Sequence, residues 1–465
     1  MAAMSSRALI WFRRDLRLGD NPAWTSACTR DKVSALVVLE PTLLAAAGPY
    51  RRRAYLSAVA GLEQTLLSRG GGLRVLEGNP AREVPKVAAE VGAEVVVVNS
   101  DVTRWSKQRD NLVKSRLDIP METHWGTLVH PPRSVLTAAG RLSRVFTAFY
   151  RRWMAKPLDI EAPPQQTEIL APPPGTALAD AYGPDLPPAW TERHAWDRLE
   201  RWLPEADQYP ENRDFPARDA TSKLSAELRF GLLSPRAVME SVGDHTPGRA
   251  AYVRQLAWRD WFAHLTFENP DIDQKSLRPE FDQIRWTSGP DADSDFEAWR
   301  TGRTGFPIVD APMRELAATG RMHNRLRMIT ASFLIKDLLI DWRRGERWFR
   351  KMLIDGDLPQ NCGNWQWVAG VGPDAAPYFR IFNPIKQSHR FDPNGHYLRK
   401  WLPELALLDN RAIHAPWEAN PSTLAAADIV LGTTYPRPIV DHAEARKATL
   451  HAYRNALPHR PPRRT

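Results

Sequence analysis

Cysteine is scarce in this chain of 465 residues, which contains two, Cys28 and Cys362. Two cysteines far apart in sequence cannot build a disulfide framework or an iron–sulfur site held by four thiolates. Long apolar runs are missing too, so the sequence predicts no membrane span. The pair Arg13–Arg14 follows apolar residues instead of preceding them, which argues against a twin-arginine export signal. These absences predict a soluble protein of the reducing cytoplasm.

Acidic residues are outnumbered, since 63 Lys and Arg stand against 54 Asp and Glu and give a net charge of +9. A basic protein of this size favours a polyanionic partner, of which nucleic acid is the commonest. A general basic bias of the proteome would produce the same balance. The 18 tryptophans are more than core packing alone usually requires.

The first part of the chain alternates strand-like and helix-like segments. Apolar runs at residues 8–12, 35–39, 73–78 and 94–99 are typical of buried parallel strands. The alternation predicts an α/β Rossmann-like N-terminal domain with a parallel sheet. No GxGxxG motif follows the first strand, so this fold class does not by itself predict a dinucleotide there.

The rest of the chain changes twice in composition and periodicity. Residues 157–190 are dense in proline and read as a surface linker, and helical periodicity follows, including one long segment over residues 325–342. We predict four regions: an α/β domain (1–130), a proline-rich linker (131–195), an all-α domain (196–455) and a basic tail (456–465).

Two short stretches of the helical part could bind a ligand. The stretch TSKLS (221–225) places hydroxyls at a helix start, where phosphate binds well, although an ordinary N-cap is the favoured explanation on these residues alone. In QLAWRDWF, the side chains of Gln255, Trp258 and Arg259 share one helical face suited to a flat aromatic ligand. The alternative is a core tryptophan with Arg259 in an ion pair.

The stretch DGDLPQNCGNWQW (355–367) combines acids, amides and indoles. A metal is not expected, because the two acids have no histidine nearby and one cysteine is not a ligand set. An organic ligand with hydroxyls and an aromatic ring fits better, and a surface turn with packed tryptophans is the alternative. Arg327 could pair with Asp355, and a buried pair of this kind is costly unless a ligand uses it. Asn361 could face a heteroatom that changes its protonation or redox state.

Seven motifs together resemble the DNA photolyase/cryptochrome family: WFRRDLRLGDNPAW (11–24), TSKLS (221–225), QLAWRDWF (255–262), GRTGFPIVDAPMREL (302–316), MHNRLRM (322–328), DGDLPQNCGNWQW (355–367) and YFRIFNPIKQ (378–387). The resemblance covers nearly the whole chain. Within the family, the sequence most resembles the bacterial class I cyclobutane-dimer enzymes. It implies an antenna domain followed by a helical FAD-binding domain. It also implies light-driven repair of cyclobutane pyrimidine dimers in DNA, in which excited reduced FAD gives an electron to the flipped-out dimer.

The resemblance also implies roles for individual residues. The expected contacts to FAD are Tyr209, Thr221, Ser222, Lys223, Leu224, Ser225, Arg259, Asn324, Arg327, Asp355, Gly356, Asp357 and Asn361, the last beside flavin N5. The expected electron-transfer triad is Trp365, Trp342 and Trp286. The expected contacts to DNA and the lesion are Arg213, Gln255, Trp258, Asn324, Arg325 and Trp367.

This chain departs from the family pattern at Gln255, where cyclobutane-dimer photolyases commonly carry Glu. Gln keeps an acceptor and gains donors but loses the charge, so we expect lower efficiency or a shifted lesion preference. Animal (6-4) photolyases carry Gln there, but they have a histidine pair where this chain has His323 and Asn324. A cryptochrome-type light sensor without repair activity is the main rival. Plant cryptochromes tend to carry Asp and Tyr at the positions of Asn361 and Trp367.

The resemblance leaves the second chromophore open. Folate-binding members use an Asn–Glu pair where this chain has Thr103 and Arg104. We therefore expect 8-hydroxydeazaflavin rather than methenyltetrahydrofolate, and a second flavin or no antenna at all are the alternatives. The expected partner is damaged DNA, and the expected oligomeric state is a monomer.

Overall fold

A computed structural model describes residues 5–162, 164, 167–178 and 186–457. It divides into two compact units. Unit 1 comprises residues 1–209 and 221–270, and unit 2 comprises residues 210–220 and 271–465. The basic tail predicted at 456–465 lies outside the described residues from 458 onward. The predicted boundaries at 130 and 195 stay predictions.

The sheet of unit 1 is parallel and has the strand order β3-β2-β1-β4-β5, with β6 pairing on β2. Its strands are β1 (Arg7–Phe12), β2 (Lys32–Leu39), β3 (Leu73–Glu77), β4 (Val95–Asn99), β5 (Met121–His124) and β6 (Glu168–Ile169). Nearly every residue of β1 and β4 is buried, because helices cover both faces. The α/β Rossmann-like fold class with a parallel sheet is confirmed. The runs at 8–12, 35–39, 73–78 and 94–99 all became strands.

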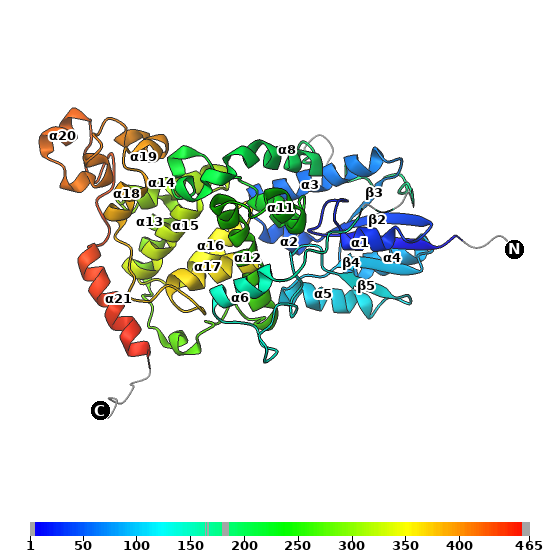
Figure 1. Ribbon diagram of the computed structural model, residues 1–465. Coiled ribbons are helices and arrows are strands. Elements are labelled where there is room, and N and C mark those ends of the chain that lie inside the picture. The colour runs from blue at the N-terminus through cyan, green and yellow to red at the C-terminus, as the bar shows by residue number, and fades with distance from the viewer. Residues whose placement is uncertain (1–4, 163, 165–166, 179–185, 458–465) are drawn as a thin grey trace, which may run out of the picture. The chain divides into compact units, whose positions relative to one another are not determined.

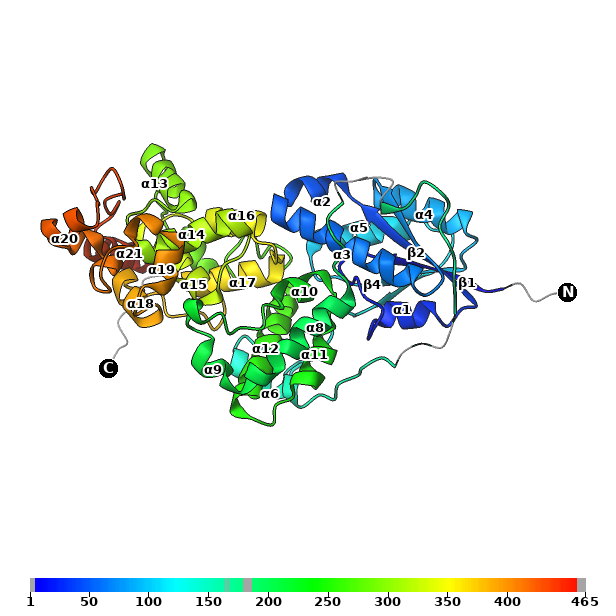
Figure 2. The same ribbon diagram turned by 90° about the horizontal axis from the view of Figure 1, so that it is seen from above.

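Helices pack on opposite sides of this sheet (Figures 1 and 2). Helices α4 (Pro80–Glu90) and α5 (Arg104–Lys114) share a core cluster with Leu9, Trp11 and Val96 on one face. Phe12 points to the other face and stacks on Trp24 of α1 (Pro22–Ala27), with ring centroids 6.2 Å apart.

The remaining helices of unit 1 are α2 (Pro41–Ala46), α3 (Pro49–Leu67), α6 (Phe146–Met154), α8 (Glu192–Trp202), α10 (Ser225–Phe230), α11 (Pro235–Val242) and α12 (Pro247–Glu268). Helix α6 and strand β6 therefore form inside the stretch expected to be a linker.

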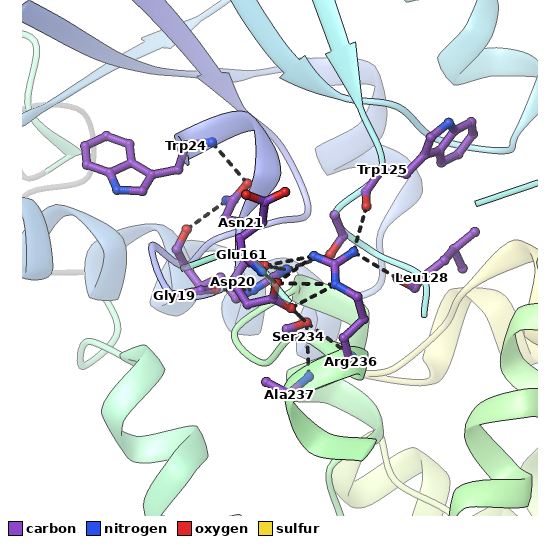
Figure 3. Close-up of polar contacts among 12 residues, drawn as sticks. Gly19, Asp20, Asn21, Trp24, Trp125, Leu128, Glu161, Ser234, Arg236 and Ala237 are labelled. Carbon is purple, nitrogen blue, oxygen red and sulfur yellow. Dashed lines mark hydrogen bonds and ion pairs between the residues drawn. The ribbon is translucent and has the colours of Figure 1, made fainter. Parts of the chain in front are cut away.

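A buried ion pair ties α11 to the loop after β1 within unit 1 (Figure 3). Arg236 lies 2.9 Å from Asp20, and Ser234 donates its hydroxyl to the same carboxylate. Arg17 donates to the carbonyl oxygens of Gly126 and Gly231. Much of the WFRRDLRLGD motif thus holds residues 221–270 to the α/β part.

Unit 2 is helical. Its helices are α13 (Pro290–Thr301), α14 (Pro307–Thr319), α15 (Asn324–Ser332), α16 (Trp342–Met352), α17 (Leu358–Ala369), α18 (Pro384–Phe391), α19 (His396–Trp401), α20 (Pro421–Ala426) and α21 (His442–Ala456). Helix α9 (Tyr209–Asn212) lies where the chain passes between the units. An all-α C-terminal region, as predicted, is confirmed.

The prediction of a single long helix over residues 325–342 is wrong. Helix α15 ends at Ser332, a π-helical turn η5 (Phe333–Asp337) follows, and α16 begins only at Trp342. Leu339 adopts φ 51°, a left-handed conformation that interrupts the helix. Apolar spacing continues through the π turn, because this segment is buried on all sides, so periodicity could not reveal the break.

Candidate functional site

Helices α15 and α17 of unit 2 line a pocket together with the loop that precedes α17. Seven of the sequence-predicted residues lie in its wall: Asn324, Arg327, Asp355, Gly356, Asp357, Asn361 and Trp365. The structure therefore brings together the part of the predicted FAD site that belongs to unit 2. Helical spacing explains the grouping, because Asn361, Trp365 and Val368 share one face of α17.

The predicted pairing of Arg327 with Asp355 is confirmed. The Nη2 atom of Arg327 lies 2.9 Å from Oδ2 of Asp355, whose side chain is 5% exposed, against 28% for Arg327. The Nε atom of Arg327 donates to the carbonyl oxygen of Met322 at 2.8 Å. Two bonds thus fix the guanidinium plane at the pocket wall.

Asn361 is oriented from behind by Glu346 of α16. Its Nδ2 atom donates to the backbone carbonyl of Glu346 at 2.8 Å and to Oε1 of the same residue at 2.9 Å. Because a backbone carbonyl only accepts, the amide nitrogen must face Glu346, and Oδ1 faces the other way. Oδ1 of Asn361 is therefore a neutral hydrogen-bond acceptor of the pocket wall with a fixed direction.

Glu346 is completely buried and was missed by sequence reasoning. Burial raises the pKa of Glu346, and the nearby Arg350 guanidinium opposes that rise. Cys362 also donates its thiol to Oε1 of Glu346 at 3.3 Å. No local motif marks Glu346, because its role depends on the packing of α16 against α17.

The three tryptophans of the predicted triad belong to the apolar core of unit 2. Trp365 and Trp342 are buried, and Trp286 is partly buried at the edge of the same cluster. The ring of Trp365 meets Phe349 edge-on at 5.1 Å. Its Cη2 atom lies only 2.1 Å from where a Cβ would stand on Gly345, so α16 needs glycine there to approach α17. Neither Trp342 nor Trp286 lines the pocket.

The two arginines of unit 2 expected to hold DNA phosphates meet at one carboxylate. Arg325 binds Asp214 at 2.8 Å, and Arg213 lies 3.9 Å from it. The guanidinium of Arg325 also covers the ring of Phe391 at 4.4 Å. Trp367 is partly buried against the core of unit 2 and does not line the pocket.

The other predicted FAD contacts lie in unit 1, and two of them, Ser222 and Tyr209, contact Tyr252. The hydroxyl of Tyr252 is 3.0 Å from Oγ of Ser222, and its ring meets Tyr209 edge-on at 5.3 Å. Residues Thr221, Ser222, Lys223, Leu224 and Ser225 form the turn that leads into α10. Lys223 adopts φ 54°, and Leu224 caps the helix without a side-chain bond. The hydroxyls of TSKLS are therefore not used as an N-cap.

Helix α12 presents Gln255, Trp258 and Arg259 in three different ways. Gln255 donates Nε2 to the carbonyl of Ala251 at 3.0 Å, which leaves its oxygen as the outward acceptor. Trp258 is stacked on Phe146 of α6, with ring centroids 3.7 Å apart and planes 11° apart.

Arg259 donates to the carbonyl oxygens of Thr127 at 2.6 Å and Leu228 at 3.3 Å. Phe146, like Glu346, was not found from the sequence, because it lies in the stretch taken for a linker.

Within the described ranges, no group of three His, Cys, Asp or Glu side chains is placed to hold a metal ion. Across the same residues, no helix combines the length and the apolar character needed to cross a bilayer.

A parallel α/β sheet in one unit and a helical pocket lined by an Arg–Asp pair and an oriented amide in the other define a class of two-part proteins with a polar pocket in the helical part. The comparisons narrow the class. Residues 8–169 match the model of DNA photolyase, and residues 252–455 match that of the FAD binding domain of DNA photolyase.

A deoxyribodipyrimidine photo-lyase of Agrobacterium fabrum is 37% identical over 97% of this chain and 98% of its own length. The crystal structure of a bacterial class III photolyase from Agrobacterium tumefaciens superposes with a TM-score of 0.89, at 37% identity over 98% of both chains. A Synechocystis cryptochrome gives a TM-score of 0.86 at 30% identity, over 97% of this chain and 100% of its own. The chain belongs to the photolyase/cryptochrome family.

Proposed function

We propose that this protein is a deoxyribodipyrimidine photo-lyase, which uses blue or near-ultraviolet light to split cyclobutane pyrimidine dimers in DNA. The observation that carries the proposal is the neutral amide of Asn361, turned by Glu346 beside the Arg327–Asp355 pair. A neutral acceptor tolerates an anionic reduced flavin better than a carboxylate would, because like charges repel. Relatives over the full length, such as the Agrobacterium fabrum protein, support this activity.

The donor set of unit 2 fits the flavin part of FAD. Asp357 and Asp355 supply carboxylate oxygens for N–H and hydroxyl groups, Arg327 supplies a cation, and Asn361 supplies an amide oxygen. Gly356 and Asn324 complete the polar wall. In unit 1, the hydroxyls of TSKLS, the amine of Lys223 and the phenol of Tyr209 suit a phosphate and ribityl chain, and Arg259 suits the flavin.

When bound and reduced, FAD supplies the light-driven electron that opens the dimer. The residues of this chain bind the dimer, exclude water and keep the flavin reduced. Trp258 would stack on the apolar dimer, since Phe146 already holds its ring plane. Trp367 would also contact the lesion, and Gln255 would offer its oxygen to a thymine N–H. Arg213 and Arg325 would contact DNA phosphates, with Asp214 keeping the two guanidinium groups together.

Trp365, Trp342 and Trp286 would supply electrons from the surface side of unit 2. Their membership of one continuous apolar core supports this role. We further propose 8-hydroxydeazaflavin as the antenna, a monomeric state, a cytoplasmic location, and the boundaries 1–130, 131–195, 196–455 and 456–465.

The test is a repair assay on the purified, reduced protein with an oligonucleotide that carries one cyclobutane thymine dimer. A (6-4) lesion and a dark sample run in parallel. We expect repair of the cyclobutane dimer in light only. If neither lesion is repaired while reduced FAD is bound, the family fold serves light sensing in this protein instead.

A further inference from the structure

Helix α21 holds the ends of the two helices that line the pocket of unit 2. It is the last helix of the chain, red in Figure 1, and it packs on the turn η5, which continues α15, and on the 3₁₀ turn η4 (Pro279–Gln283). Thr449 donates its hydroxyl to the carbonyl oxygen of Lys336 in η5 at 2.6 Å. Tyr453 donates its phenol to the carbonyl oxygen of Ala369, the last residue of α17, at 2.7 Å. Polar contacts of α21 therefore tie the end of α15 to the end of α17.

A third polar contact of α21 joins two ionisable side chains. The Nδ1 atom of His442, the first residue of α21, lies 2.5 Å from Oδ1 of Asp337, the last residue of η5. The side chain of Asp337 is 1% exposed, against 18% for His442. The other oxygen of Asp337, Oδ2, is buried and has no hydrogen-bond partner among the described residues. The charge of this buried carboxylate is therefore met from one side only, by an imidazole that water can reach.

In the described part of the chain, no other charged group takes the place of His442 beside Asp337. The remaining acids and bases of η4, η5 and α21 are exposed or have partners of their own. They are Lys336, which binds the carbonyl oxygen of Ala369, Asp441, which accepts from the N–H of Glu444, Glu444, which pairs with Lys447, Glu280, which pairs with Arg278, Asp282, which pairs with Arg343, and the exposed Arg446, His451 and Arg454. The turn η5 also packs on α15 and α16, but among the described charged groups only His442 acts on Asp337.

This contact makes the docking of α21 depend on pH. Burial raises the pKa of Asp337 from 3.8 to about 6, and the hydrogen bond and the charge of His442 oppose that rise. An acid whose pKa is higher in the docked state favours docking while it is protonated, so its contribution is complete below about pH 4 and is lost as the pH rises through about 6. The histidine acts in the same direction, because an imidazole loses its positive charge as the pH rises. A buried carboxylate without a cation then opposes docking.

We propose that α21 is a pH-sensitive clamp on the flavin pocket and that His442 and Asp337 form its latch. The inference rests on the proposed function in one respect, namely that the pocket lined by α15 and α17 holds FAD. While the latch is closed, α21 ties the two helices together at their ends, and the pocket keeps its spacing. When Asp337 is charged and His442 is neutral, α21 leaves η5 more often, the carboxylate reaches water, and bound FAD is released faster.

The test follows the opening of α21 and not repair. Hydrogen–deuterium exchange of the full-length, FAD-loaded protein is read by mass spectrometry on peptides of α21 and corrected for the pH dependence of chemical exchange. We expect the opening constant of α21 to rise about tenfold between about pH 5 and about pH 8, with most of the rise below about pH 7, as the shifted pKa of Asp337 requires. Peptides of the buried strand β4 should show no such rise.

Two variants at the latch should differ in their response to pH. Asp337→Asn removes the titrating charge and keeps the shape, so the opening constant should no longer change with pH. His442→Gln removes the cation but leaves the buried carboxylate, so the pH dependence should persist and opening near pH 8 should exceed that of the unsubstituted protein. A contact with a merely structural role would raise opening in both variants by the same factor at every pH. His451→Gln is the control, because His451 is exposed on the same helix and bonds only to Asn455.

Release of FAD, followed by the rise of flavin fluorescence after dilution, tests the link from the latch to the pocket. The release rate should increase with pH in parallel with the opening of α21, and it should be independent of pH in Asp337→Asn. An opening constant that does not change with pH overturns the latch and leaves the proposed function intact. Opening that depends on pH without any change in FAD release overturns the clamp. A protein that binds no FAD at any pH overturns the proposed function, and exchange of α21 in that protein still decides the latch.

Discussion

Asn361 and Glu346 form a pair in which a buried acid sets the direction of an amide. The Nδ2 atom of Asn361 gives both of its protons to Glu346, at 2.8 Å to the backbone oxygen and 2.9 Å to Oε1. The amide oxygen is thereby committed to the other side. A side chain held by two bonds keeps its orientation when a ligand changes charge, which is what a redox cofactor requires of its surroundings.

Replacing Asn361 by Asp places a carboxylate where the neutral oxygen stands. We expect the reduced anionic flavin to lose between about 1 and about 4 kcal/mol, the range for two unit charges roughly 4 Å apart in water and near a protein surface. The midpoint potential of bound FAD should fall accordingly in a spectroelectrochemical titration. Asn420→Asp is the control, because Asn420 is exposed in unit 2 and does not line the pocket. Equal potentials for both variants would remove Asn361 from the flavin.

The Arg327–Asp355 pair should contribute to stability as well as to binding. Arg327→Met leaves the carboxylate of Asp355, 5% exposed, without its cation. We expect a loss of about 2–3 kcal/mol in the free energy of unfolding, measured with urea. Adding Asp355→Asn to Arg327→Met should restore more than half of the lost free energy of unfolding. Arg300→Met, which breaks a half-exposed pair with Glu297, should cost less than about 1 kcal/mol.

Trp365→Phe should block photoreduction of oxidised FAD and leave repair intact when the flavin is reduced chemically beforehand. Phenylalanine fills most of the space but is much harder to oxidise than an indole. Trp299→Phe is the control, since Trp299 is buried and contacts Trp365 at 6.3 Å but is outside the triad. Photoreduction that persists in Trp365→Phe would exclude Trp365 from the electron path.

Trp258→Ala should weaken binding of dimer-containing DNA by roughly 1–3 kcal/mol, the usual value of one stacked base. The Trp258 ring is already stacked on Phe146, with centroids 3.7 Å apart, so fixing its orientation when a base binds costs little conformational entropy. Fluorescence anisotropy with damaged and undamaged duplexes measures the difference. Trp258→Phe keeps an aromatic face and should retain part of the affinity. Unchanged binding by the Ala variant would rule out its role in the pocket.

Gln255→Glu should raise the quantum yield of cyclobutane-dimer repair. The Nε2 bond to the carbonyl of Ala251, 3.0 Å long, cannot form with a carboxylate, which is repelled by that oxygen and turns outward. The outward group then meets the lesion with its charge. Yields from single-turnover repair of a dimer oligonucleotide decide the matter. A lower yield would show that the pocket has adapted to the amide.

The sequence by itself determined the buried strands of the sheet and which chemistry is available. Buried strands at 8–12 and 94–99 were readable because both faces of a parallel sheet are covered, which leaves an unbroken apolar run. The Arg327–Asp355 pair was also predictable, since a cation and an acid that are both at least partly buried need each other as partners. The family motifs supplied the identity of the cofactor.

Only the tertiary structure decided how these groups are held. Glu346 stands behind Asn361 because α16 and α17 pack closely at Gly345, and no local pattern records that approach. The π turn before Trp342 and the ion pair of Asp20 with Arg236 arise in the same way. Hydrophobic spacing reports which residues are buried, whereas the partner of each buried polar group depends on elements that are distant in sequence.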